Sequence, residues 1–246
     1  MFNLGYTYKR PKTLFGTQNA KTIKGEKLGY TTLILYMSPE KQNTAGKNLC
    51  AHASEGCKAA CLFTAGRGKF SNVMTARIHK TEYFLREKAL FLEQVYNEVA
   101  KGYKKHGKAL AVRLNGTSDI PYENIPVGGF KNIMAMFPDV QFYDYTKIFN
   151  RLTKQLPSNY HLTFSRAETA TNQKEAQQAI DLGFNVAAVF KVKDETELPE
   201  TYMNAKVING DEHDLTFLHG NGVIVGLKAK GEAKKDTTGF VIGGCN

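Results

Sequence analysis

The chain has 246 residues, with 33 Lys or Arg against 23 Asp or Glu, which gives a net charge of +10. A length of this size fits one large domain, and 42% hydrophobic with 23% charged residues excludes a disordered or collagen-like chain. No apolar run approaches the ~20 residues of a membrane span, and no signal-peptide pattern opens the sequence, so we expect a cytoplasmic protein. The net positive charge is compatible with nucleic acid or another polyanion as partner. A net charge can also serve only to prevent self-association through electrostatic repulsion.

The N-terminal 30 residues are polar, basic and dotted with glycine, which predicts a surface arm. Apolar, β-branched or aromatic runs of strand length follow, bounded by Gly, Pro, Asn and Asp. These runs predict strands at 31–38, 109–115, 140–146, 160–166, 185–191, 206–210 and 223–228.

Helical patterns separate several of these strands. Apolar residues at near-helical spacing predict a long helix over 72–105, and a weaker pattern covers 129–136. A further helix is expected over 172–182, with Thr171 as N-cap and Gly183 at its C-terminal end. Alternating strands and helices predict parallel strands joined by right-handed crossovers, and hence an α/β fold.

We therefore expect one α/β domain built on a partial or complete (βα)-barrel-like parallel sheet, with a cysteine-rich loop after the first strand. An open doubly wound sheet is the alternative. The arm covers residues 1–30, the barrel-like core 31–230, and a C-terminal tail 231–246 returns to the site.

Polar and basic residues stand at the ends of the predicted strands. In both architectures the carboxyl ends of parallel strands gather at one rim, where ligands bind. The alternative is that polar residues only mark where strands leave the core. On the first interpretation the rim binds anionic groups through Arg113, Lys147, Arg166, Lys191 and Lys228.

Three cysteines lie close together in the segment that follows the first predicted strand. Cys50, Cys57 and Cys61 form a C-x6-C-x3-C pattern, and Cys245 lies in the C-terminal tail, where it is placed to complete a four-thiolate site. Paired C-x2-C knuckles typical of zinc are absent, so the spacing favours an iron–sulfur cluster, with zinc as the alternative metal. Buried thiols without a metal are the remaining interpretation.

An acidic segment at 209–214 (NGDEHD) contains three carboxylates and one histidine. With Asp119 and Asp144 it suggests a metal-dependent nuclease as an alternative function, because paired carboxylates hold divalent cations beside phosphate. An acidic surface turn is the plainer interpretation.

Two resemblances to known families follow from these motifs. The cysteines after the first strand of a barrel-like sheet resemble the radical S-adenosylmethionine enzymes, although that family's usual spacing is C-x3-C-x2-C. The resemblance implies a [4Fe–4S] cluster on Cys50, Cys57 and Cys61. It also implies that S-adenosylmethionine binds near RLNGTSD (113–119), through Asn115, Ser118 and Asp119.

A second resemblance covers most of the chain. The segments LCAHASEGCKAACL, AVRLNGTSDI, FYDYTK, HLTFSR, VINGDEHD and GVIVGLKAKGEAKKD, in this order, are similar to an uncharacterised bacteriophage family of gene-product-eighty-eight-like proteins. This resemblance implies phage or plasmid origin, and thus the host cytoplasm, but brings no activity.

The leading hypothesis is an iron–sulfur protein of phage type, as a radical-chemistry metalloenzyme acting on a phosphorylated or nucleic-acid substrate. The alternatives are a non-enzymatic nucleic-acid-binding protein with a structural iron–sulfur or zinc centre, and a metal-dependent nuclease.

Overall fold

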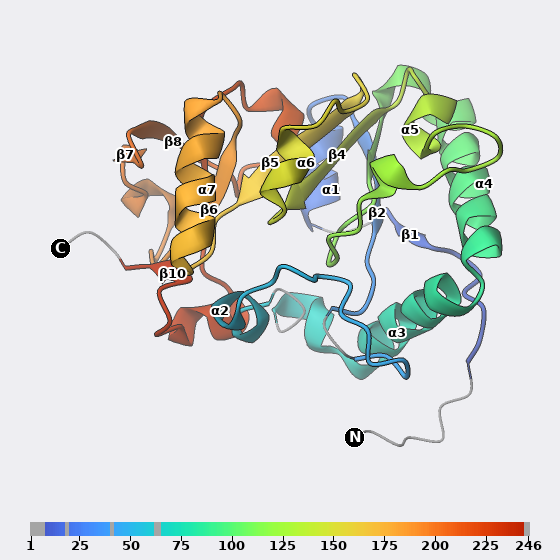
Figure 1. Cartoon of the computed structure of the whole chain (residues 1–246), viewed down its shortest axis with the longest axis horizontal. Coiled ribbons are helices and arrows are strands. Elements are labelled where there is room, and N and C mark those ends of the chain that lie inside the picture. The colour runs from blue at the N-terminus through green and yellow to red at the C-terminus, as the bar shows by residue number, and fades with distance from the viewer. Residues whose placement is uncertain (1–7, 18–19, 40–41, 62–64, 244–246) are drawn as a thin grey trace.

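The fold is built on one large, mostly parallel sheet (Figure 1). The computed structural model describes residues 8–17, 20–39, 42–61 and 65–243. Seven strands run parallel in the order β2-β3-β4-β5-β6-β9-β8. They are β2 (Thr31–Leu35), β3 (Leu110–Arg113), β4 (Gln141–Thr146), β5 (Tyr160–Ser165), β6 (Val186–Phe190), β8 (Ala205–Asn209) and β9 (Ile224–Lys228). Each predicted strand is thereby confirmed, as is the parallel arrangement.

Three further strands, each of two residues, extend the sheet. β1 (Phe15–Gly16) pairs antiparallel with β2, and β7 (Thr201–Tyr202) pairs antiparallel with β8. β10 (Val241–Ile242) runs parallel to the carboxyl end of β6. Among the described strands the two ends of the sheet do not pair, so the sheet is open and a complete barrel is not formed.

The helices are α1 (Ala20–Glu26), α2 (Glu55–Ala59), α3 (Ser71–Arg86), α4 (Lys88–His106), α5 (Ile133–Met136), α6 (Phe149–Leu152) and α7 (Ala170–Asp181). The single helix expected over 72–105 is wrong, because Glu87 leaves the helical conformation (φ −136°, ψ 51°) and separates α3 from α4. Its carboxylate accepts hydrogen bonds from the hydroxyl of Tyr8 (2.6 Å) and from Nε of Arg10 (3.0 Å). The N-terminal segment therefore holds the break in place.

Two other helices begin differently from the prediction. The N-cap of α7 is Thr169, whose side chain accepts a hydrogen bond from the backbone N–H of Asn172, so α7 begins two residues earlier than a Thr171 cap implies. Gly183 follows α7 with φ +83°, as expected of a glycine after a helix. α5 covers only the second half of the predicted 129–136, starting after the capping side chain of Asn132.

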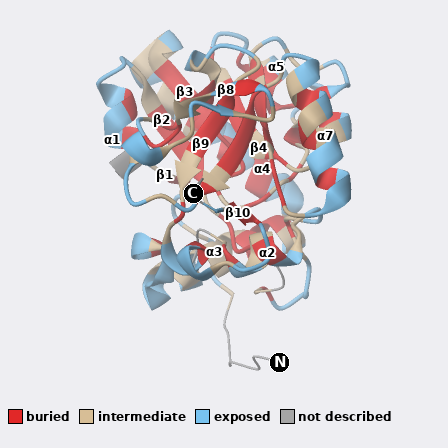
Figure 2. Cartoon of the chain, turned by 90° about the vertical axis from the view of Figure 1, so that its left-hand side faces the viewer, coloured by how far each residue is buried: buried red, intermediate tan, exposed pale blue. Residues whose placement is uncertain are grey.

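The strand side chains divide between two faces, as the period of two requires. One face carries the main core, where Leu110, Val112, Phe142 and Phe164 pack with apolar residues of α3 to α7. The other face carries a smaller cluster that includes Ala111, Tyr143 and Leu215. Figure 2 shows the buried residues concentrated in the strands, with exposed residues on the outer sides of the helices.

In Figure 1 the helices α2 and α3 lie at the lower side of the molecule, and α3 leads directly into α4 after the break at Glu87. They belong to the long connection between β2 and β3, which contains all three cysteines of the sequence cluster. This connection is the part of the fold that positions the site.

Candidate functional site

A cavity of 270 Å³ lies at the carboxyl ends of the parallel strands. Its wall combines the segment after β2, the segment after β3, the ends of β4, β5, β6 and β9, and the C-terminal region. The polar residues and cysteines on this wall include Cys50, Cys57, Cys61, Arg113, Asn115, Thr117, Ser118, Asp119, Lys147, Ser165, Asp211, Asp214, Lys228 and Lys230. Most of the residues singled out from the sequence therefore line one cavity.

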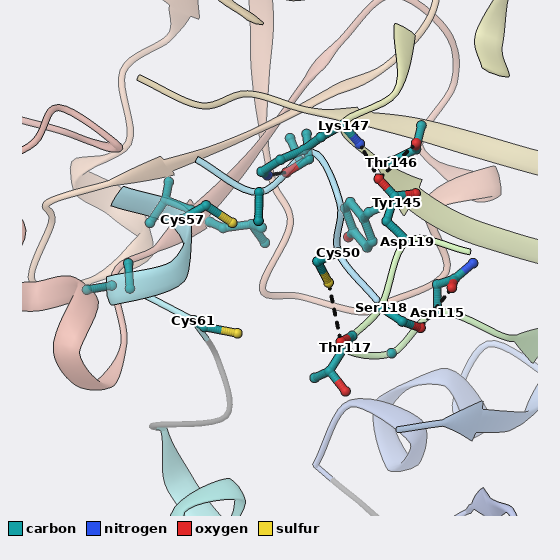
Figure 3. Close-up of a pocket in the computed structure, with 18 of the residues that line it drawn as sticks. Cys50, Cys57, Cys61, Asn115, Thr117, Ser118, Asp119, Tyr145, Thr146 and Lys147 are labelled. Carbon is teal, nitrogen blue, oxygen red and sulfur yellow. Dashed lines mark hydrogen bonds between the residues drawn. The ribbon is translucent and has the colours of Figure 1, made fainter. Parts of the chain in front are cut away.

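Residues 50–61, called here the cysteine segment, bring three thiols to this cavity. Cys50 lies in an irregular stretch after β2, Cys57 lies within α2, and Cys61 follows α2. All three residues line the cavity, and in Figure 3 the sulfur atom of Cys50 points toward the carbonyl of Thr117. The segment is thus partly helical, and not the continuous loop expected from the sequence.

The first residues of α2 are held by hydrogen bonds to Glu168, a residue that follows β5. The hydroxyl of Ser54 accepts a hydrogen bond from the backbone N–H of Cys57 (3.2 Å) and donates one to the carboxylate of Glu168 (2.6 Å). The other oxygen of Glu168 accepts from the backbone N–H of Gly56 (2.9 Å). Because Glu168 follows β5, this carboxylate ties the helix that carries Cys57 to the middle of the sheet.

The thiols influence one another electrostatically. Burial raises the pKa of Cys50 well above its usual range, and Cys61, Asp119 and Cys57 raise it further, while Lys147 opposes the shift. Among the described residues, no three His, Cys, Asp or Glu side chains are grouped so that they can hold a metal ion. Cys245 lies outside the described residues.

Residues 115–120, called here the strand-end loop, follow β3 and form a densely hydrogen-bonded structure. The carboxylate of Asp144, on β4, accepts from the backbone N–H of Asn115 (2.7 Å), from Nδ2 of Asn115 (3.0 Å) and from the hydroxyl of Tyr160 (2.8 Å). The side-chain oxygen of Asn115 accepts from the hydroxyl of Ser118 and the backbone N–H of Ile120, both at 2.8 Å. Asn115 thereby folds the loop around its own side chain.

Asp144 is fully buried beneath this loop. Burial raises its pKa to about 6, against the opposing effects of Arg113, the Asn115 backbone N–H, Arg151 and Tyr160. The carboxyl group is therefore ionised at neutral pH, where it accepts the hydrogen bonds that shape the loop.

Four contacts join the strand-end loop to the chain that follows β2. Backbone N–H groups of Gly116 and Asp119 donate to the carbonyls of Leu35 (2.9 Å) and Leu49 (2.8 Å). The hydroxyl of Thr117 donates to the Met37 carbonyl (2.5 Å), and the thiol of Cys50 donates to the Thr117 carbonyl (3.5 Å; Figure 3). A Cβ atom at Gly116 would lie 2.8 Å from the Leu35 carbonyl oxygen, so this close approach requires glycine.

Asp119 is held on both carboxylate oxygens. One forms an ion pair with Arg151 (2.5 Å), and the other accepts from the backbone N–H of Lys147 (2.8 Å) and the hydroxyl of Thr146 (3.2 Å). Asn115, Ser118 and Asp119 thus lie at the cavity as the sequence predicts, but their polar side-chain atoms bind protein groups. Their position supports the wall, and a role in cosubstrate contact stays a prediction.

The basic residues expected at strand ends divide into three groups. Arg113 and Lys228 line the cavity together with Lys230, which was not among the predicted residues, and all three are paired with acids: Arg113 with Asp214 (2.7 Å), Lys228 with Glu195 (3.1 Å), and Lys230 with Asp211. The guanidinium of Arg113 also lies 4.6 Å from the centre of the Tyr145 ring, and its Nε is buried without a hydrogen-bond partner.

Lys147 differs from these three residues. Its Nζ donates to the hydroxyl of Ser165 (2.5 Å) and lies 5.5 Å from the centre of the Phe240 ring. It forms no ion pair within the described part of the chain. An unpaired ammonium on a cavity wall is a ready binding group for an anion.

Arg166 and Lys191 do not line the cavity. Arg166 follows Ser165 and points to the other side of the strand, where its Nη1 donates to the carbonyls of Gly239 (2.5 Å) and Phe240 (2.9 Å). Lys191 is exposed, and its backbone N–H donates to the Ile242 carbonyl (2.8 Å). Both residues hold the C-terminal strand β10, which is a structural use of positions expected to bind anions.

Comparison with known proteins identifies the family to which this chain belongs. The model of the family described as Gene product 88 matches residues 13–244. The chain belongs to this family. No curated protein and no solved structure matches it. The predicted phage gene-product family is thus confirmed, whereas the resemblance to radical S-adenosylmethionine enzymes receives no support from these comparisons.

In this member of the Gene product 88 family, the acidic segment 209–214 does not gather into a carboxylate cluster. Asp214 pairs with Arg113 and accepts from the hydroxyl of Tyr143 (3.3 Å), whereas Asp211 pairs with Lys230 and accepts from the Lys228 backbone N–H (2.9 Å). Asp119 and Asp144 bind other groups, as described above. The carboxylates therefore serve to neutralise and orient cations at the rim.

Several residues that shape the site escaped sequence reasoning. Glu168 has no motif around it, and its partners Ser54 and Gly56 are more than 100 residues away. Ser165 is visible in the sequence as a polar residue at a strand end, but the anion site was assigned to the next residue, Arg166, on the opposite face of the strand. No helix among the described residues is long and apolar enough to cross a membrane, which agrees with the expectation from the sequence.

Proposed function

We propose that this protein holds an iron–sulfur cluster on Cys50, Cys57 and Cys61 and binds a small phosphorylated ligand beside it. The observation that carries the proposal is that these three thiols and the unpaired ammonium of Lys147 face one cavity at the carboxyl ends of the strands. Thiolates are soft ligands that favour iron–sulfur clusters and zinc, and a reducing cytoplasm keeps them available.

The spacing of the thiols favours a cluster over a single zinc ion. Structural zinc sites usually present their ligands as paired C-x2-C knuckles, which this sequence lacks. A cluster of several iron and sulfide atoms is larger than one ion, so its cysteine ligands lie farther apart. Three thiols that line one cavity are compatible with that larger group.

When bound, such a cluster would supply electron transfer and, through an iron without a cysteine ligand, a binding position for S-adenosylmethionine. The protein's own residues would prepare the surroundings. The strand-end loop fixes Cys50 through Thr117, Glu168 fixes the helix of Cys57, and apolar Ala187, Val189, Leu227 and Phe240 line the cavity. The consecutive order of β2 to β6, with α4 to α7 packed in the core of one face, resembles a partial (βα) barrel.

The anionic ligand would bind at Lys147 and Ser165. Ser165 accepts a hydrogen bond from Lys147, so its own hydroxyl proton is left to donate to a phosphate oxygen. Arg113, Lys228 and Lys230 are already neutralised by acids, which favours a small phosphorylated ligand over a nucleic-acid strand. A nucleic-acid-binding protein with a structural centre remains the competing hypothesis, which predicts salt-dependent DNA or RNA binding.

The decisive experiment measures iron and sulfide in protein purified without oxygen and reconstituted with ferrous iron and sulfide. We expect cluster absorption and an electron paramagnetic resonance signal on reduction, both lost in Cys50→Ala, Cys57→Ala and Cys61→Ala. A protein that takes up no iron, or that keeps its cluster in all three variants, would overturn the proposal.

The remaining cysteine supplies the matched control. Cys245→Ala should retain the cluster if three thiolates suffice, and a spectral change on adding S-adenosylmethionine would then support an open iron position. Loss of the cluster in Cys245→Ala would instead identify a saturated four-thiolate centre with a structural or electron-transfer role.

The anion subsite is tested separately by calorimetric titration with inorganic pyrophosphate. Lys147→Met should weaken binding at least tenfold, whereas Lys228→Met, which removes an acid-paired lysine of the same wall, should change it less than threefold. Equal losses in both variants, or no binding by the native chain, would reject this subsite.

A further inference from the structure

Arg77, on α3, is half-buried and forms no ion pair with any of the residues that the structure describes. Its Nε and Nη1 are both inaccessible to solvent and have no hydrogen-bond partner. Arg86 on the same helix is, by contrast, ion-paired with Glu82 (2.8 Å) and half exposed. Burying an unpaired charge is among the costliest arrangements in a protein, so the isolation of Arg77 requires an explanation.

The position of Arg77 connects it to the cavity wall. Its guanidinium lies 5.2 Å from the centre of the Tyr36 ring. Tyr36 in turn packs against Gly116 of the strand-end loop, where a Cβ atom would lie 2.7 Å from its ring. Arg77 therefore lies behind the wall of the cavity, on the side formed by α3 and the residues after β2.

The charges around Arg77 point to the cysteine segment as the source of a counter-ion. Burial lowers the pKa of Arg77, and the groups that oppose this shift are Tyr36 and Cys61. A second cation, Lys80, lies one helical turn away. Burial lowers the pKa of Lys80 to about 8, Glu98 opposes that shift, and Arg77 adds to it. Arg77 and Lys80 thus place two cations close together on α3, and Cys61 is among the groups that favour the charge of Arg77.

We propose that Arg77 is a positioning residue for the metal centre, and that its charge balances the negative charge which the cysteine thiolates bring when they hold a cluster. The inference rests on the proposed function, because it assumes that Cys61 becomes a thiolate ligand. It explains why a guanidinium is buried without an acid: the compensating charge arrives with the bound group. The Tyr36 ring holds the guanidinium in place meanwhile through a cation–π contact.

The first test uses the reconstituted protein. Replacing Arg77 by Met removes a positive charge near the cluster, so the reduction potential should become more negative and the iron content at limiting iron should fall at least threefold. Arg77→Lys should restore most of both values. Arg86→Met, at the solvent-exposed end of the same helix, should leave both unchanged.

The second measurement separates charge balance from ordinary packing. In urea unfolding of the metal-free protein, Arg77→Met should be as stable as the native chain or more stable, since an unpaired buried charge has been removed. A residue that only supports the fold would show the opposite sign. A clear loss of metal-free stability together with an unchanged potential would overturn the inference.

A third readout needs no metal. In the full chain carrying Cys50→Ala, Cys57→Ala and Cys245→Ala, iodoacetamide alkylation of the remaining Cys61 should be about three- to tenfold slower after Arg77→Met, because a nearby cation favours the thiolate. Slower alkylation in a protein that binds no iron would reject the proposed function, and with it a role of Arg77 at a metal centre, and would leave only an interaction of Arg77 with the Cys61 thiolate. A cluster that forms normally while potential and alkylation both ignore Arg77→Met would reject the role of Arg77 alone.

Discussion

The strand-end loop and the cysteine segment line one cavity, but they differ in how many of their polar groups are hydrogen-bonded to other protein groups. In the loop, Asn115 and Asp119 bind protein partners through every side-chain heteroatom, and Asp144 beneath them does the same. On the cysteine side, the thiols face the cavity and the neighbouring Arg77 is buried with two unpaired nitrogens. The difference teaches that the loop is a finished scaffold, while the cysteine side carries the thiols and the cation on which the proposed function depends.

The strongest test of the scaffold is Asp144→Asn. The new amide nitrogen would face hydrogen-bond donors of Asn115 and Tyr160, so buried donors would lose their acceptor. We expect the free energy of unfolding at neutral pH to fall by roughly 2–4 kcal/mol, from two or more lost charge-assisted hydrogen bonds. Urea titration measures this loss, and Asp139→Asn, at an exposed acid, is the control. A loss as small as that of the control would contradict the idea of a scaffold.

A somewhat smaller effect is expected where α2 contacts the C-terminal region. A Cβ atom at Gly56 would clash with Thr238 and would lie 2.8 Å from Cβ of Phe240 and 2.9 Å from Cδ of Glu168. Gly56→Ala should therefore cost about 1–3 kcal/mol, as overpacking does. At Gly16 a Cβ atom would make only an ordinary contact, 3.8 Å from the Ile34 carbonyl oxygen, so Gly16→Ala should change stability little. Similar midpoints for the two variants in thermal unfolding would show that α2 is not held against this region.

Ser54→Ala tests how α2 holds Cys57 at the cavity, with a smaller expected loss of stability. The substitution removes the N-cap of α2 and the bond to Glu168, which should cost about 1 kcal/mol. Asn132→Ala removes the cap of α5, outside the cavity wall, and serves as the comparison. Both should lower stability, but only Ser54→Ala should lower iron uptake. Equal iron uptake would mean that α2 does not need this cap to present Cys57.

The last expected effect concerns Lys80 and the dependence of stability on pH. Because its folded pKa is lowered to about 8 from 10.5, the unfolded chain binds the proton more tightly than the folded chain does. The unfavourable contribution of Lys80 is complete below pH 8 and fades as the pH rises from 8 to 10.5. Relative to Lys80→Met, the native protein should therefore gain stability over this range. A constant difference between the two unfolding curves would refute this expectation.

The seven parallel strands could be predicted from the sequence, whereas the two-residue strands and the break between α3 and α4 could not. Seven strands were visible because apolar runs such as 31–38 and 185–191 are bounded by turn residues. β1, β7 and β10 have two residues each, too few to give any periodic signal. The break at Glu87 was hidden because its cause, the contact with Tyr8 and Arg10, comes from a distant part of the chain.

For the site, the position of many residues could be predicted from the sequence, but their hydrogen-bonding partners could not. Strand-end position brought Arg113, Asn115, Asp119, Lys147 and Lys228 to one cavity as predicted. Sequence position alone does not reveal which polar atoms are already bonded, so the satisfied amide of Asn115 and the unpaired ammonium of Lys147 looked alike. Arg166 was assigned to the wrong side because a one-residue change reverses the face of a strand, and Ser165 takes the cavity position instead.

The strand β10 has a consequence for how the cavity is assembled during synthesis. Phe240, which precedes β10, forms part of the cavity wall, and β10 pairs with β6, made some fifty residues earlier. A nascent chain that stops before Phe240 carries every other strand of the sheet but leaves this wall incomplete. If the cavity binds the proposed group, that group meets a complete wall only after Phe240 and β10 have been made.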